Sequence, residues 1–229
     1  CFILFTFAAV FSGCGESGFD SLRRLYGEDA NYYIGLRKKA EGEEKAARQL
    51  FLRCLKKGSY YAALRSAEEL VQLGTVQERL SACEKLLAKY GDEDAILIAL
   101  GAYENAGEYS KILTLTESID MTSCKNDIAR IRLGALFKRN NRQFQDEAYT
   151  WYTSRPMTLS MNRLYRETVT EGLQSAKSKI INFRIDVYNA NYNSAYERFS
   201  EIRETVIKNG TLPLTAQIVS DMGKACLYG

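Results

Sequence analysis

The chain has 229 residues, of which 46% are hydrophobic and 26% are charged, an ordinary composition for a folded protein. Its 31 basic and 28 acidic residues leave a formal net charge of +3, and no dense Lys/Arg run occurs, so we expect no nucleic-acid partner. The chain contains no histidine, which excludes Ser–His and Cys–His nucleophile pairs and histidine-based zinc sites.

The first segment is a nine-residue apolar run from Phe2 to Val10. It is too short to span a bilayer as a helix, but it has the length of the apolar core of a signal peptide. The residues that follow are Phe11-Ser12-Gly13-Cys14 and then a Gly/Ser-rich polar stretch. The pattern resembles a bacterial lipoprotein signal, although Phe11 departs from the usual leucine. The alternative is a short buried strand or helix with a chance cysteine.

We therefore predict a signal peptide over residues 1–13 and lipidation of Cys14. No methionine or basic segment precedes Cys1, so we expect the signal to be clipped at its start. Residues 14–25 are predicted to be the lipidated cysteine and a flexible tether. More than one acyl chain on the cysteine would anchor the protein stably to a membrane of the cell envelope, on its periplasmic or surface face.

The next feature is a series of glycines at positions 42, 58, 74, 91 and 107, spaced by 16 or 17 residues. Glycine commonly follows a helix C-terminus, because it enters the left-handed conformation without a Cβ penalty. The series predicts helices about four turns long, paired into hairpins with a period near 33 to 34 residues. After a lead-in helix from Tyr26 to Lys39, we expect about eleven helices beyond residue 42 and no strand.

Helix 76–90 is the clearest of these, with Thr75 and Glu78 forming a capping box at its start. Its apolar stripe follows three- and four-residue steps through Val76, Leu80, Cys83, Leu87 and Tyr90. The only two prolines are predicted to lie in a turn (Pro156) and in the first turn of the last helix (Pro213).

A short motif recurs at the helix pairs, in the forms Gly58-x-Tyr60-x-x-Ala63 and Gly107-x-Tyr109-x-x-Ile112, with looser copies at Phe144 with Glu147 and at Ala190-x-Tyr192-x-x-Ala195. Over residues 42–209 the chain resembles the tetratricopeptide family. The resemblance implies an all-α, superhelical α-solenoid of stacked helical hairpins, whose first helices line a concave side. The aromatic positions are 49, 35 and 48 residues apart, so we expect extra helices inserted at 76–90 and near 158–174. We assign residues 26–229 to this irregular solenoid and expect it to continue beyond Gly229.

A weaker resemblance is to the non-catalytic N-terminal helical domain of soluble lytic murein transglycosylases, carried by the layout and by Asp221-Met222-Gly223-Lys224-Ala225. The catalytic glutamate of those enzymes lies in a Glu-Ser dipeptide followed by Gly-Leu-Met-Gln. Neither Glu16-Ser17 nor Glu117-Ser118 has that continuation, and Glu117 is predicted to be a solvated helix-end carboxylate. We predict no catalytic residue, metal site or cofactor within this chain.

The tetratricopeptide register predicts a binding groove on the concave side. The inward-facing polar residues in this register are Lys45, Arg48, Lys56, Asp94, Glu104, Asn105, Arg132, Arg139, Asn140, Lys177 and Arg184. Cations dominate this set, so the wall is suited to a carboxylate, such as a peptide C-terminus or the acidic stem of a cell-wall peptide. The alternative is a charged helix face that serves solubility.

The cysteines and the single tryptophan point to packing rather than chemistry. Cys54, Cys83, Cys124 and Cys226 are widely spaced and no C-x-x-C occurs, so we predict buried free thiols, although an exported protein permits disulfides in any of three pairings. Trp151 is predicted to fill the interior between two hairpins.

Two functions follow from these observations. The first is an exported, lipid-anchored helical-repeat scaffold that binds a protein or peptide partner of the bacterial cell envelope, or peptidoglycan. The alternative is the non-catalytic superhelical domain of a peptidoglycan lytic transglycosylase whose catalytic domain lies beyond Gly229.

Overall fold

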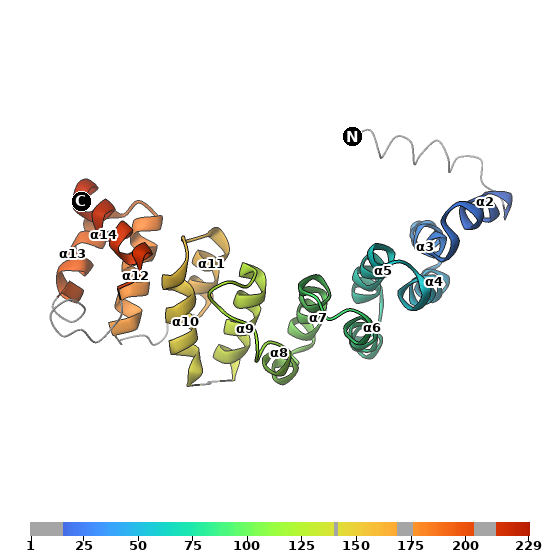
Figure 1. The fold of residues 1–229 in the computed structure, drawn as a ribbon, viewed down its shortest axis with the longest axis horizontal. Helices are drawn as coiled ribbons and strands as arrows, with labels where there is room; N and C mark the ends of the chain where they lie inside the picture. Colours follow the sequence, from blue (N-terminus) through green and yellow to red (C-terminus); the bar gives the residue numbers. More distant parts are fainter. Residues whose placement is uncertain (1–15, 140–141, 169–175, 204–213) are drawn as a thin grey trace. The chain divides into compact units, whose positions relative to one another are not determined.

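A computed structural model describes residues 16–139, 142–168, 176–203 and 214–229, and the regular elements in these ranges are all helices (Figure 1). Consecutive helices mostly pack against one another, so the predicted all-α architecture of helical hairpins is confirmed. Eleven α-helices follow residue 42 in the described ranges, as the glycine series predicted. The chain divides into two compact units, Cys1–Gly107 and Glu108–Gly229.

Unit 1 contains α2 (Glu16–Tyr26), a 3-10 turn η1 (Gly27–Asp29), α3 (Ala30–Ala40), α4 (Glu44–Lys57), α5 (Tyr60–Leu73), α6 (Val76–Lys89) and α7 (Glu93–Ala106). From α3 onward each helix packs on the next, and α3 also contacts α5, α4 contacts α6 and α5 contacts α7. The unit therefore has two layers, one of α3, α5 and α7 and the other of α4 and α6 (Figure 1). This alternation is the basic geometry of a helical-repeat stack.

The core of unit 1 is formed by the facing stripes of α4 and α5. On α4, Ala47, Phe51 and Leu55 recur every four residues, and none is more than 2% exposed. Small residues on the facing helices allow the backbones to come close: a Cβ added to Gly35 of α3 would lie 2.6 Å from the ring of Phe51. On α5, Ala63 of the repeated motif is fully buried in the same cluster.

The helix ends confirm only part of the glycine prediction. Gly42 and Gly107 adopt left-handed φ angles of 82° and 72°. Gly58 and Gly74 instead have extended backbones, with φ of −70° and −79°, and Gly91 also lies outside the left-handed region. At Gly58 the reason for glycine is space, because an added Cβ would lie 2.7 Å from the carbonyl oxygen of Cys54. The predicted capping box at the start of α6 is present, with Thr75 and Glu78 exchanging both hydrogen bonds.

The structure differs from the sequence analysis at the predicted tether, because residues 16–26 form helix α2. Its apolar residues pack on α3: the ammonium of Lys38 lies 5.9 Å from the centre of the Phe19 ring, and the rings of Tyr26 and Tyr33 are 5.4 Å apart. The lead-in helix predicted from Tyr26 to Lys39 is present largely as α3, and α2 is a further helix before it, joined to it by η1. Residues 1–15, including Cys14, lie outside the described residues.

Unit 2 contains α8 (Tyr109–Leu115), α9 (Asn126–Lys138), α10 (Gln143–Ser154), α11 (Leu159–Thr168), α12 (Ala176–Tyr188), α13 (Tyr192–Arg203) and α14 (Ala216–Tyr228). Helix α9 contacts α8, α10 and α11, and α12 contacts α10, α13 and α14. Trp151 on α10 is fully buried beside Tyr152, with 5.0 Å between ring centres, which confirms its predicted interior position. Pro156 lies between α10 and α11, and Pro213 lies outside the described residues.

The extra helices predicted at 76–90 and near 158–174 are present as α6 and α11. Of the four cysteines in the described ranges, Cys54, Cys83 and Cys124 are buried free thiols, as predicted, whereas Cys226 is free and exposed. Among the described helices, none has both the length and the apolar character needed to cross a bilayer.

Candidate functional site

A cavity of the described surface lies in unit 1 between α4 and α6, and we call it the α4/α6 groove. It has a volume of about 740 Å³, within the range of roughly 300–1,000 Å³ typical of ligand sites. Its lining residues are Leu52, Arg53, Leu55 and Lys56 from α4 and Lys85, Ala88 and Lys89 from α6.

The groove forms because two helices of one layer lie side by side and are joined at both ends. Near the N-terminal ends, Arg48 Nη1 pairs with Glu78 Oε2 at 2.8 Å. Near the C-terminal ends, Lys89 Nζ donates to the carbonyl oxygens of Leu55 and Gly58, at 3.3 and 3.1 Å. The latter contacts also satisfy carbonyl groups at the end of α4, where a cation is favourable.

All four charged residues of the lining are cations, but they differ in their partners. Arg53 is held by Glu28, with distances of 3.0 and 3.2 Å, and its hydrogen bond lowers the pKa of that carboxyl. Lys89 is occupied at the end of α4. Lys56 and Lys85 have no hydrogen bond or ion pair with any described residue. Two ammonium groups of the groove are thus available to an anion.

The structure places the predicted groove residues of unit 1 in two different layers. Lys45, Arg48 and Lys56 lie on α4, whereas Asp94, Glu104 and Asn105 lie on α7. Helix α7 packs against α6 and α5, and no contact of comparable extent joins it to α4 among the described residues. Of the six, only Lys56 lines the α4/α6 groove.

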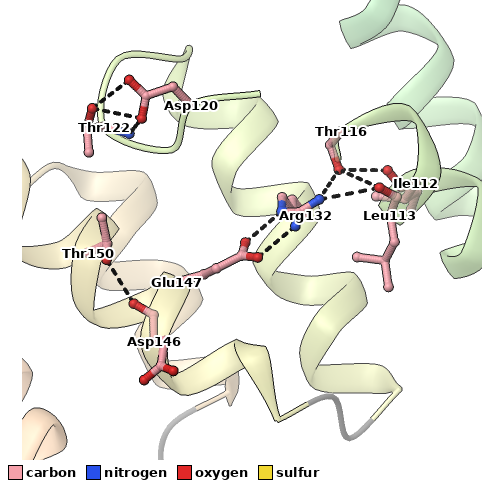
Figure 2. A network of polar contacts seen from close by, with 9 residues as sticks. All are labelled: Ile112, Leu113, Thr116, Asp120, Thr122, Arg132, Asp146, Glu147 and Thr150. Carbon is pink, nitrogen blue, oxygen red and sulfur yellow. Dashed lines mark hydrogen bonds and ion pairs between the residues drawn. The ribbon is translucent and has the colours of Figure 1, made fainter. Parts of the chain in front are cut away.

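In unit 2 the predicted residue Arg132 is buried and committed to its own fold, as Figure 2 shows. Its guanidinium forms two bonds of 2.6 Å with the carboxylate of Glu147 on α10. A third nitrogen donates to Thr116 Oγ1 at 2.9 Å and to the carbonyl oxygen of Leu113 at 3.3 Å. One side chain therefore joins α9 to α10 and to the end of α8, which is a structural role.

Arg184 on α12 is also buried, with 1% of its surface exposed. Its Nε lies 2.6 Å from Asp221 Oδ2 on α14, and its Nη1 donates to the carbonyl oxygens of Tyr152 and Arg155. A small cavity of about 270 Å³ adjoins this pair. The geometry ties three segments of the chain together, and the charge is satisfied within the protein.

The remaining predicted residues of unit 2 lie nearer the surface. Arg139 donates to Ser110 Oγ, and Lys177 pairs with Asp146. Asn140 lies outside the described residues. In unit 2 the four described residues of the predicted set each pair with another residue of the unit, whereas in unit 1 Lys56 has no partner among the described residues. The predicted residues thus do not form one continuous wall within either unit.

Four lining residues were not predicted from the sequence: Leu52, Arg53, Lys85 and Lys89. A signal for two of them was present, because Lys85 and Lys89 are four residues apart and so lie on the same helix face with the same charge. Nothing in the sequence showed that this face of α6 lies beside Lys56, since that depends on the packing of the inserted helix.

The described residues hold no cluster of three or more His, Cys, Asp or Glu side chains arranged for a metal ion. Burial raises the pKa of Cys83 to about 12 and also raises the pKa of Cys54, so these thiols are poor nucleophiles in the folded protein. Comparison with protein-family models, with curated proteins and with solved structures found no match.

Proposed function

We propose that the protein is an exported, lipid-anchored helical-repeat scaffold of the tetratricopeptide type, which binds a protein or peptide partner in the bacterial cell envelope. The observation that carries the proposal is the α4/α6 groove, where apolar and unpaired basic side chains lie together in a concave surface. Helical stacks bind through such extended surfaces without reactive groups.

The lipid anchor is proposed from the sequence around Cys14, where an apolar run meets small residues and a cysteine. Together the two features define a tethered receptor: acyl chains hold the N-terminus at a membrane, and the groove is presented to partners in the adjoining compartment. The site needs no cofactor to perform this role.

The partner site is tested in living cells by site-specific photo-crosslinking. A photoreactive amino acid replaces Leu52 in the groove, and in a matched control it replaces Val76, which is 55% exposed at the start of α6. We expect a discrete adduct, identified by mass spectrometry, from position 52 and not from position 76. Equal labelling from both positions, or none from position 52, would refute a partner at this groove.

The anchor is tested separately by Cys14→Ala. We expect the variant to move from the membrane fraction to the soluble fraction, since it loses the residue that carries the lipid. Continued membrane association of the variant would contradict the lipoprotein assignment, whatever the crosslinking result.

A further inference from the structure

The charge arrangement of the α4/α6 groove identifies the chemistry of its occupant. We infer that the groove binds an internal polypeptide segment in which acidic and large apolar side chains are interspersed. The inference rests on the proposed function and adds to it the class of partner and the groups that recognise it.

The first observation is that the groove lining contains no acidic side chain, so it lacks the ion pairs within one helix that are found elsewhere in unit 1. On α3, Arg37 and Lys38 both bond to Glu41, three or four residues along the chain. On α5, Arg65 bonds to Glu68. Such pairs within one helix are what a solubilising face uses to lower its electrostatic energy.

The groove has the opposite arrangement, because its charged lining residues are all cations. Lys85 and Lys89 are four residues apart on α6, a spacing at which like charges destabilise a helix. Arg53 and Lys56 are similarly close on α4. Arg53 and Lys89 already have partners within the protein. Lys56 and Lys85, which lie on opposite sides of the groove, are the two cations left without a partner among the described residues. Bound carboxylates between them would relieve the repulsion.

The second observation is an apolar strip between these cations. Leu52 is 38% exposed although α4 has a complete buried stripe on its other face. Leu52, Leu55 and Ala88 contribute to the lining alongside the lysines. Apolar side chains of the occupant would therefore lie on Leu52 and Ala88 while its carboxylates meet Lys56 and Lys85.

A polypeptide fits these features better than a nucleic acid does. The groove lining contains no aromatic side chain on which a base would stack, and its one guanidinium is already paired with Glu28. Two free lysines supply few phosphate contacts, and the net charge of the chain is only +3. An exposed leucine has no role in contacting a phosphate backbone.

The test measures binding of short labelled peptides to the full chain by fluorescence anisotropy. The main probe alternates Glu and Leu, and its N-terminus is acetylated and its C-terminus amidated, so that only side-chain carboxylates are available. The comparison probes replace every Glu by Gln, or every Leu by Ser. A single-stranded oligonucleotide of equal charge is the third comparison.

We expect the Glu/Leu peptide to bind more tightly than each of the three comparison probes. Lys56→Gln combined with Lys85→Gln should weaken its binding about tenfold, since two ion pairs are lost. Adding salt should weaken binding to the unaltered protein, because screening shortens the Debye length to ~10 Å at ~0.1 M. The matched control combines Lys138→Gln with Lys179→Gln, two exposed lysines of unit 2, and should bind like the unaltered protein.

Several results would overturn the inference. These are equal binding of the Glu and Gln peptides, unchanged binding after the Lys56/Lys85 substitutions in a protein with an unaltered circular dichroism spectrum, and equal losses in the control. Tighter binding of the oligonucleotide, or binding that needs a free C-terminal carboxylate, would also contradict it. A crosslink at position 52 combined with any of these outcomes would leave the proposed partner site intact and refute only the acidic, apolar occupant.

Discussion

The buried pair of Arg184 and Asp221 allows a quantitative test of the structure of unit 2. The perturbations are Arg184→Met, Asp221→Leu and the double variant. Asp221→Leu leaves Arg184, which is 1% exposed, without its ionic partner, whereas Arg184→Met leaves Asp221, which is 5% exposed, with only the Lys224 ammonium at 3.4 Å. The double substitution removes both charges and replaces them with apolar side chains.

The magnitude follows from this burial. Removing one member of a buried ion pair costs about 3–5 kcal/mol, because the remaining charge is desolvated and uncompensated. A double variant with both charges removed avoids that penalty, although the carbonyl groups of Tyr152 and Arg155 lose a donor. We therefore expect the double variant to be more stable than the sum of the single losses predicts, with a coupling energy of about 2–3 kcal/mol.

The assay is urea unfolding followed by the fluorescence of Trp151, the only tryptophan. Trp151 is fully buried in α10 and adjoins Tyr152, whose carbonyl oxygen accepts a hydrogen bond from Arg184, so its signal reports on this part of unit 2. The control is Lys177→Met, which removes a surface pair with Asp146 and should cost less than about 1 kcal/mol.

A loss of less than about 1 kcal/mol of unfolding free energy in either single variant would refute a buried, interacting pair. A double variant that loses the full sum of the two single losses would also refute it, because the two charges would then not interact. A loss in the Lys177→Met control as large as in Arg184→Met would show that burial is not the cause.

Three further predictions concern helix ends and thiols. Thr75→Ala removes the capping box of α6 and should cost about 0.5–2 kcal/mol in urea unfolding, while Thr75→Ser should cost little. Gly58→Ala should destabilise the folded protein because the added Cβ would meet the Cys54 carbonyl. Ala190 has a φ of 59°, so Ala190→Gly should stabilise the folded protein by about 1 kcal/mol. Thermal melts with shifts of the opposite sign would contradict these two predictions. With the two N-terminal cysteines replaced by serine, a thiol reagent at pH 8 should modify exposed Cys226 rapidly and the three buried cysteines only after unfolding; fast labelling of Cys83 would contradict its burial.

Helix positions were predictable because their signals are local. The capping box at Thr75 and the stripe of α6 each lie within one helix, and the structure contains both. The start of α2 was not predicted because the residues before Phe19 are rich in Gly and Ser, which indicated a flexible segment. The apolar residues of α2 are few, and they pack on α3, which lies later in the chain. The prediction of a left-handed conformation at Gly58 was wrong. Glycine is required there because the Cys54 carbonyl leaves no space for a Cβ, and not because of the φ angle.

The predicted binding residues show where local reasoning ends. The repeat register predicted that Arg132 and Arg184 face the groove, but both are buried in ion pairs in the structure. Their partners, Glu147 and Asp221, are 15 and 37 residues away, beyond any spacing that helical periodicity relates. Lys56 lines the α4/α6 groove, whereas Lys85, which faces it across the groove, was not identified from the sequence.

The sequence alone was sufficient to establish an all-helical hairpin architecture. The signals were the period of apolar residues, the helix-capping residues and the spacing of glycines, and each depends on residues that are close together in the chain. Packing was needed to establish which layer each helix joins, and so which cations are buried, paired or open. Helix α6 packs beside α4 and α7 beside α5, and this arrangement brings Lys85 and Lys56 to the same groove. The availability of a charge depends on the side chains brought against it by folding, and those side chains are distant in the sequence.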